Sequence, residues 1–113
     1  MDKGSPGYAL EKLSAAVHVL ATGTGDVRAR LGHAFMSFHP VQERDFPKHL
    51  REDWRWVKSQ LTRFGPLYDP EGKVSVGSVD HTLSRIKNST GAKIAAKIVH
   101  LQEELECFLR QDQ

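Results

Sequence analysis

A long run of helical periodicity at the C-terminal end is the feature that most constrains this chain. Between Val79 and Leu109, apolar residues and the half-apolar Thr90 recur every three or four positions, at 79, 83, 86, 90, 94, 98, 101, 105 and 108. This spacing places their side chains on one face of an α-helix. A lone helix has no interior in which to bury such a face, so the preceding segments must pack against it. The sequence therefore predicts a helical bundle built along a C-terminal helix over residues 78–110.

The periodicity changes phase within this predicted helix. With about 100° between successive residues, the apolar centre of Val79–Ile86 is rotated by roughly 80° from that of Ile94–Leu109. Lys87 would also point into the apolar face of a straight helix. Gly91 lies between the two halves, where it costs about 1 kcal/mol relative to alanine. We therefore expect a kink near Gly91 in preference to two separate helices, with Thr90 and Gly91 packed tightly against another helix.

Three earlier segments repeat the helical spacing and are separated by turn residues. Asp26 or Thr24 is a suitable N-cap for the second of them, whereas Asp45 and Pro47 are typical of the start of the third. Residues 1–7 are rich in glycine, serine and proline, and are expected to form a loose tail. The helices are predicted over residues 8–22, 26–38 and 47–63.

The longest link runs from residue 64 to residue 77. Within it, Lys73–Val76 alternates polar and apolar residues, but no second strand is evident, so we expect an extended loop there. The length of the chain fits one domain with a single core. The fold expected is therefore all-α, a single domain over residues 8–113 in which four antiparallel helices pack up-down-up-down.

The composition is that of an ordinary globular protein, with 27% charged residues and a formal net charge of +2. The one cysteine, Cys107, cannot form an internal disulfide, and its apolar neighbours predict a buried or half-buried, structural thiol. No apolar run reaches the roughly 20 residues of a membrane span, and the first residues do not resemble a secretion signal. We therefore expect a cytoplasmic protein that does not enter a membrane.

No cofactor or metal is expected. The glycine-rich turn at Thr22–Asp26 follows a helix and lacks the lysine of a phosphate-binding loop, so nucleotide binding is not predicted. The histidines outside the pairs discussed below lack the spacing of metal ligands, and His81 is expected in solvent. The acidic run Glu103, Glu104 and Glu106 is typical of a solvated helix end.

The predicted third helix carries a basic stripe that includes Arg55 and Lys58. Trp56 lies on a different side, away from the apolar stripe, and is expected either to be buried or to form part of a contact patch. The stripe predicts a surface for an acidic partner protein or nucleic acid, and the alternative is a solvated helix side balanced by neighbouring carboxylates. The function predicted is a non-enzymatic, self-associating binding or regulatory module. The predicted surface consists of Lys48, Arg51, Arg55, Trp56 and Lys58.

A histidine follows an arginine five positions later at two places, Arg28…His33 and Arg44…His49. This spacing resembles the Arg-x4–6-His motif of the HEPN ribonucleases, which are small all-α proteins that act as dimers. The resemblance covers six residues. It implies an arginine that polarises a phosphate and a histidine that acts as acid or base on a ribose hydroxyl. Pro47 interrupts the second pair, so Arg28 and His33 are the catalytic pair of this alternative function, a metal-independent ribonuclease.

Overall fold

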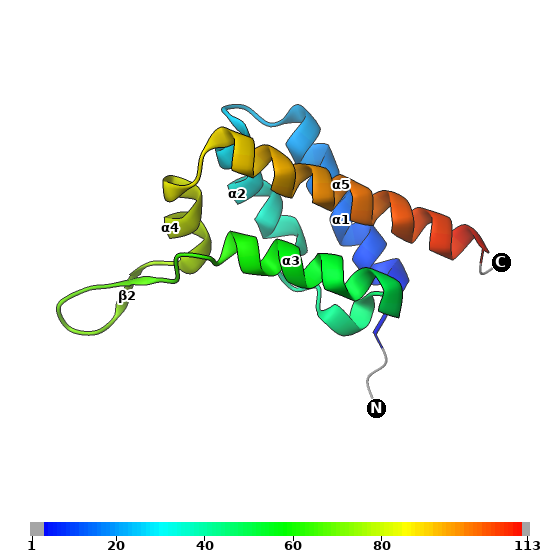
Figure 1. Ribbon diagram of the computed structural model, residues 1–113, viewed down its shortest axis with the longest axis horizontal. Coiled ribbons are helices and arrows are strands. Elements are labelled where there is room, and N and C mark those ends of the chain that lie inside the picture. The colour runs from blue at the N-terminus through cyan, green and yellow to red at the C-terminus, as the bar shows by residue number, and fades with distance from the viewer. Residues whose placement is uncertain (1–3, 112–113) are drawn as a thin grey trace.

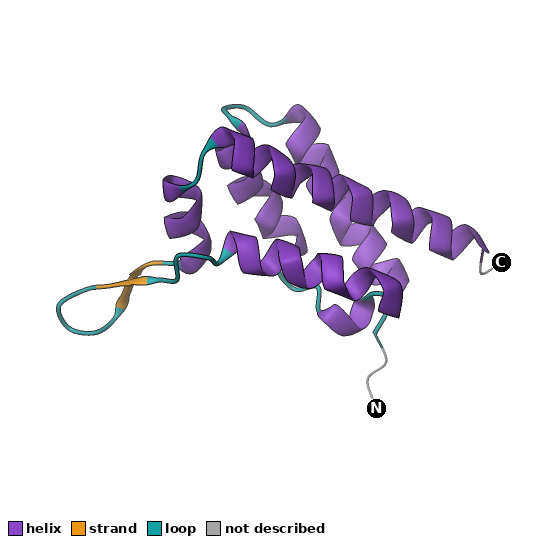
Figure 2. Cartoon of the chain, viewed as in Figure 1, coloured by secondary structure: helices purple, strands orange, loops and turns teal. Residues whose placement is uncertain are grey.

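The computed structural model describes residues 4–111. Helices dominate this part of the chain (Figure 2), which contains five α-helices, two short 3-10 turns and one pair of short strands. In chain order (Figure 1) these are α1 (Pro6–Thr22), α2 (Val27–Phe38), η1 (Glu43–Asp45), η2 (Lys48–Leu50), α3 (Arg51–Leu61), β1 (Leu67–Tyr68), β2 (Val74–Val76), α4 (Ser78–Arg85) and α5 (Asn88–Gln111). The all-α prediction is confirmed, whereas the antiparallel four-helix bundle is not.

The helices α1, α2 and α5 enclose much of the core. α1 packs on both α2 and α5, and α5 also contacts α2 and α3. The side chains of Leu13, Leu31, Phe38, Ile94 and Ile98 are fully buried, and burial of each such side chain is worth about 1.5–3 kcal/mol. α4 packs on α2 and α3 at the end of the molecule from which the β1–β2 hairpin projects (Figure 1).

The predicted C-terminal helix is interrupted, because α4 ends at Arg85 and α5 begins at Asn88. Ile86 adopts extended backbone angles, with φ −80° and ψ 159°, and its side chain is buried in the core. The expectation of one kinked helix is therefore wrong. The break allows the apolar faces of α4 and α5 to point in different directions, and it leaves Lys87 exposed. A kink at Gly91 would lie after Lys87 and would not move its side chain out of the apolar face.

Gly91 lies at a close approach between α5 and α2. A β-carbon built on Gly91 would lie 3.0 Å from Cγ1 of Val27 and 3.5 Å from Cδ1 of Leu31. Gly91 is buried, so its predicted tight packing against another helix is confirmed, whereas Thr90 is half-buried. The absence of a side chain at Gly91 allows the two helices to approach closely, and α5 continues through this residue.

The link after α3 contains a β-hairpin, so the expectation of an extended loop at Lys73–Val76 is wrong. β1 and β2 pair antiparallel, with Leu67 opposite Val76 and Tyr68 opposite Val74. β1 has only two residues, which are too few to show an alternating pattern in the sequence. The apolar side chains of both strands are largely exposed.

The first turn of α1 is tied to η1. Ser5 caps α1 by accepting a hydrogen bond from the N–H of Tyr8, and the N–H of Ser5 donates to Asp45. The carboxylate of Asp45 also accepts from the N–H of Gln42, so Asp45 does not cap the third helix as expected. α1 begins at Pro6, inside the predicted tail, and residues 1–3 of that tail lie outside the described residues.

Two side chains differ in environment from the prediction. Cys107 is exposed, because it lies on the side of α5 opposite the fully buried Leu105. His81, expected in solvent, is half-buried against the turn that follows α3. Within residues 4–111, no helix combines the length and the apolar character needed to cross a bilayer.

Candidate functional site

Arg55 and Lys58 of the predicted basic stripe lie together in a groove of about 520 Å³. One wall of this groove is α3, and the other is the link between α2 and η1. We call it the α3 groove, and its lining residues are His39, Pro40, Val41, Gln42, Glu43, Trp54, Arg55 and Lys58. The helical spacing of the sequence thus identified one wall of a concave surface.

Among the residues that line the α3 groove, Glu43 carries the one carboxylate, which pairs with Arg55. Nη1 of Arg55 lies 3.2 Å from Oε2 of Glu43, and the two side chains are 61% and 42% exposed. An ion pair this exposed to solvent contributes about 0.2–1 kcal/mol. An external carboxylate can therefore replace Glu43 at little cost in free energy.

The floor of the α3 groove is an aromatic stack. Nζ of Lys58 lies 5.8 Å from the centre of the Trp54 ring, in a cation–π contact. Trp54 is only 2% exposed and stacks on Phe46, with their ring centres 4.8 Å apart. The core thus fixes the surface beneath Lys58, whereas Arg55 extends into solvent.

The other three residues of the predicted surface lie elsewhere. Nε of Arg51 donates a hydrogen bond of 2.9 Å to the carbonyl oxygen of Phe46, which holds the segment that precedes α3. Lys48 is exposed in η2. Trp56 is half-buried on another side of α3, where Nζ of Lys97, from α5, lies 5.9 Å from its ring centre. The five predicted residues therefore do not share one surface.

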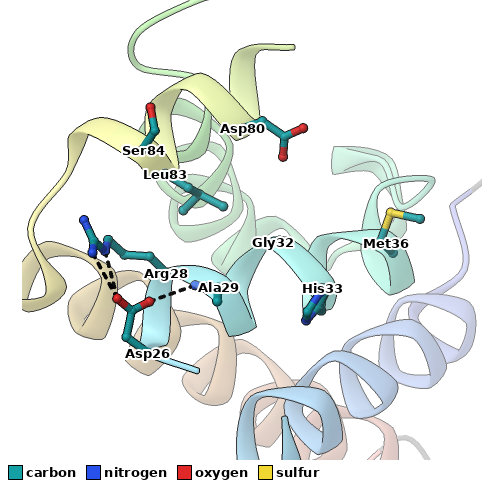
Figure 3. Close-up of a pocket in the computed structure, with 9 residues that line it drawn as sticks. All are labelled: Asp26, Arg28, Ala29, Gly32, His33, Met36, Asp80, Leu83 and Ser84. Atoms are coloured by element: carbon teal, nitrogen blue, oxygen red, sulfur yellow. Dashed lines mark hydrogen bonds and ion pairs between the residues drawn. The ribbon is translucent and has the colours of Figure 1, made fainter. Parts of the chain in front are cut away.

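Arg28 and His33 line a second groove, of about 650 Å³, between α2 and α4 (Figure 3). We call it the α2–α4 groove. His33 is exposed, but the guanidinium of Arg28 turns toward Asp26 and away from His33 (Figure 3). The remaining lining residues are Asp26, Ala29, Gly32, Met36, Asp80, Leu83 and Ser84.

The guanidinium of Arg28 is engaged by the fold. Its Nη2 lies 3.0 Å from Oδ2 of Asp26, and its Nη1 donates to the carbonyl oxygen of Ile86 at 3.2 Å. Asp26 is the N-cap of α2, as predicted, and accepts the N–H of Ala29. This backbone hydrogen bond, and then the hydrogen bond from Arg28, lower the pKa of the Asp26 carboxyl. Arg28 thus neutralises Asp26 and satisfies a carbonyl at the α4–α5 break.

Helical spacing did not identify His39 and Glu43 as residues of the α3 groove. Both lie between α2 and η2, where the backbone is irregular and no period relates a residue to α3. Glu43 precedes Arg55 by twelve positions, and only the fold brings their charges together. The sequence carries no local signal for this wall of the groove.

Comparison with known proteins does not assign this chain to a family. No family model, no curated protein and no solved structure matches it. In the part of the chain that the structure describes, no three His, Cys, Asp or Glu side chains are grouped so as to hold a metal ion. The function is therefore inferred from the two grooves and the charges that line them.

Proposed function

We propose that this chain is a small non-enzymatic binding module that holds an acidic segment of a partner protein in the α3 groove. The observation that carries this proposal is the ion pair of Arg55 with Glu43, in which the groove already accommodates a carboxylate. A partner carboxylate would take the place of Glu43 on Arg55, and a second would lie near Lys58. The guanidinium group can pair with a carboxylate through two parallel hydrogen bonds, which fixes the orientation of the ligand.

The rest of the α3 groove supports the same class of ligand. Lys58 is held over the buried ring of Trp54, so less side-chain entropy is lost when it binds an anion. Lys48, exposed in η2, adds positive charge that attracts an acidic partner from a distance. Nucleic acid is the other partner class that this charge fits, and its affinity would fall steeply with salt because counterions are released.

Anisotropy of a labelled glutamate-rich peptide tests the proposal. We expect Arg55→Gln/Lys58→Gln to weaken binding at least about tenfold, because two charge-assisted hydrogen bonds of about 1.5–3 kcal/mol each are lost. The control Lys93→Gln/Arg110→Gln removes the same charge from exposed positions of α5 and should change the affinity less than about twofold. Equal losses in both double variants, or no binding by the wild-type chain, would contradict the proposal.

We also propose that the chain self-associates. Among its exposed large apolar side chains, Leu67, Tyr68 and Val74 all belong to the hairpin, and a short two-stranded sheet leaves strand edges open to pairing. Light scattering over a range of concentrations tests this, because the single chain has a mass of 12.7 kDa. A constant mass equal to that of one chain would remove self-association from the proposal.

A metal-independent ribonuclease using Arg28 and His33 is the second candidate, favoured by their presence in one groove. It ranks lower because the guanidinium of Arg28 is already paired with Asp26. Incubation of the wild-type chain and of His33→Ala with RNA tests this candidate, and we expect no cleavage by either. Cleavage that His33→Ala abolishes, with unchanged thermal unfolding, would reverse the ranking.

A further inference from the structure

A second basic cluster lies where the hairpin joins the helices. Arg63 and Phe64 follow α3, and Arg85 is the last residue of α4. Cζ of Arg63 lies 5.3 Å, and Cζ of Arg85 4.7 Å, from the centre of the Phe64 ring. Both arginines are exposed, whereas the phenylalanine is half-buried. We refer to Arg63, Phe64 and Arg85 as the arginine cluster.

The backbone beneath the arginine cluster is held in place by α4. The N–H of Phe64 donates a 3.1 Å hydrogen bond to Oγ1 of Thr82, which is fully buried. Nδ1 of His81 lies 3.1 Å from the carbonyl oxygen of Phe64 and 2.9 Å from that of Gly65. Both oxygens are acceptors, so Nδ1 must carry a proton and donate. Two side chains of α4 thus fix the backbone at Phe64, which organises the cluster in advance of any ligand.

The two guanidinium groups have no carboxylate partner within residues 4–111. Arg28 and Arg55, in contrast, are each paired with one. The acidic residue of α4, Asp80, lines the α2–α4 groove instead (Figure 3). Two cations held within 5.3 Å of one ring centre repel each other, and only solvent screens that repulsion. The free energy of the arginine cluster therefore falls when anions bind to the two guanidinium groups.

We propose that the arginine cluster binds backbone phosphates of single-stranded nucleic acid. Each guanidinium group presents a planar pair of N–H donors that matches two oxygens of a phosphate. One carboxylate would neutralise only one of the two charges, whereas a nucleic acid strand supplies one negative charge per nucleotide. The two arginines thus match two phosphates of the same strand.

The hairpin favours a single strand over a duplex. Tyr68, in β1, follows Phe64 by four positions, and 62% of its surface is exposed. An exposed aromatic ring can stack on an unpaired base, but bases inside a duplex are already stacked on each other. The hairpin thus extends the phosphate site with a surface for the bases.

The arginine cluster is separate from the α3 groove. Neither Arg63 nor Arg85 lines that groove, so substitutions in one site should leave the other unchanged. Loss of peptide binding in Arg55→Gln/Lys58→Gln would therefore say nothing against the nucleic acid site. The two proposals succeed or fail independently.

Anisotropy of a labelled single-stranded RNA of mixed sequence, measured with the full chain over a series of salt concentrations, tests the proposal. We expect Arg63→Gln/Arg85→Gln to lower the affinity at least about tenfold and to reduce the slope of log K against log salt by about 1.4, or about 0.7 for each phosphate contact. Lys93→Gln/Arg110→Gln removes the same charge from exposed positions of α5 and should keep the wild-type slope. A wild-type chain that does not bind, or equal changes of slope in both double variants, would overturn the proposal.

Because the two arginines cover Phe64, thermal unfolding of each variant accompanies the binding measurement. Arg63→Lys/Arg85→Lys provides a second test if the glutamine variant does not fold, since lysine keeps the charge but lacks the planar fork of donors. A lower affinity of the folded lysine variant supports phosphate recognition by the guanidinium groups. An unchanged affinity overturns it.

Competition and a tyrosine variant identify the class of ligand. Tyr68→Ala should weaken RNA binding about tenfold, because a stacked base is lost, and should leave competition by inorganic pyrophosphate unchanged. If Tyr68→Ala has no effect and pyrophosphate displaces the RNA fully, the site binds free phosphate compounds and the nucleic acid proposal is overturned. If a glutamate-rich peptide displaces RNA as well as unlabelled RNA does, the ligand is an acidic protein and the proposal also fails.

Discussion

The α2–α4 groove and the α3 groove each contain an arginine paired with a carboxylate, at 3.0 Å and 3.2 Å. The distances are similar, but the surroundings differ. The side chain of Arg28 is 36% exposed and also donates to the carbonyl of Ile86. That of Arg55 is 61% exposed and, among residues 4–111, has only Glu43 as its partner. An arginine with two partners in the fold, such as Arg28, therefore stabilises the structure, whereas one with a single exposed partner, such as Arg55, is free to bind a ligand.

The largest effect should follow from filling the space that α2 and α5 share beside Arg28. Gly91→Val adds a side chain where even a β-carbon would lie 3.0 Å from Val27 and 3.6 Å from Cγ of Arg28. Such overpacking costs about 1–3 kcal/mol, and we expect a loss of unfolding free energy near the upper end of that range in urea titrations. Peptide affinity of the α3 groove should be retained in the folded variant. A loss that is confined to peptide binding would contradict the division between the two grooves.

A direct comparison of the two arginines should give the next largest effect. Arg28→Ala leaves the Asp26 carboxylate and the Ile86 carbonyl without their shared donor, so we expect the unfolding free energy to fall by about 1–3 kcal/mol. Arg55→Ala removes only an exposed ion pair and should lower it by less than about 1 kcal/mol. Chemical unfolding of both variants under the same conditions provides the measurement. Equal losses would mean that the second partner of Arg28 contributes nothing.

A smaller effect should appear in the pH dependence of stability. The pKa of Asp26 is lowered from its ordinary value of 3.8 in the folded chain, mainly by the N–H of Ala29 and then by Arg28. The folded state therefore binds fewer protons there than the unfolded state. The stabilisation is present above pH 3.8 and is lost as the pH falls through the lowered pKa. Asp26→Asn keeps an N-cap, so the stability difference between wild type and variant should vanish in acid. A difference that does not change with pH would contradict this account.

The smallest effect is expected from Glu43→Gln, which releases Arg55 without adding a charge. The unfolding free energy should change by less than about 1 kcal/mol, as for other exposed ion pairs. Affinity for the glutamate-rich peptide should rise about threefold, because Arg55 no longer has to leave a competing carboxylate. Parallel peptide titrations of the variant and the wild type measure this. A weaker affinity would show that Glu43 positions Arg55 for its ligand.

Much of the core could be predicted from the sequence, because the helical period depends only on local geometry. Helical spacing places five apolar residues of this segment on one predicted inner face, and all are buried: Leu83, Ile94, Ile98, Leu101 and Leu105. The phase change also indicates a discontinuity in the first half of the predicted C-terminal helix. Whether the chain kinks or breaks there is decided by tertiary contacts, since the carbonyl of Ile86 is satisfied by an arginine 58 residues earlier in the chain.

Only part of the candidate sites could be predicted from the sequence. Arg55 and Lys58 are predicted to lie on one face of a helix, because they are three positions apart. The opposite wall of their groove comes from an irregular link, which has no period. Arg63 and Arg85 are separated by the whole hairpin and most of α4, so only the fold could show that they meet at Phe64.

The hydrogen bond from Arg28 to Ile86 also bears on how the molecule opens. It ties the junction between α4 and α5 to α2, and its rupture would allow α4 and the hairpin to detach as one cooperative unit while α1, α2 and α5 stay packed. Amides of α4 should then exchange their hydrogens with solvent faster than those of α5. A ligand that bridges Arg63 and Arg85 would join the end of α3 to the end of α4, and would slow that exchange without touching Arg28.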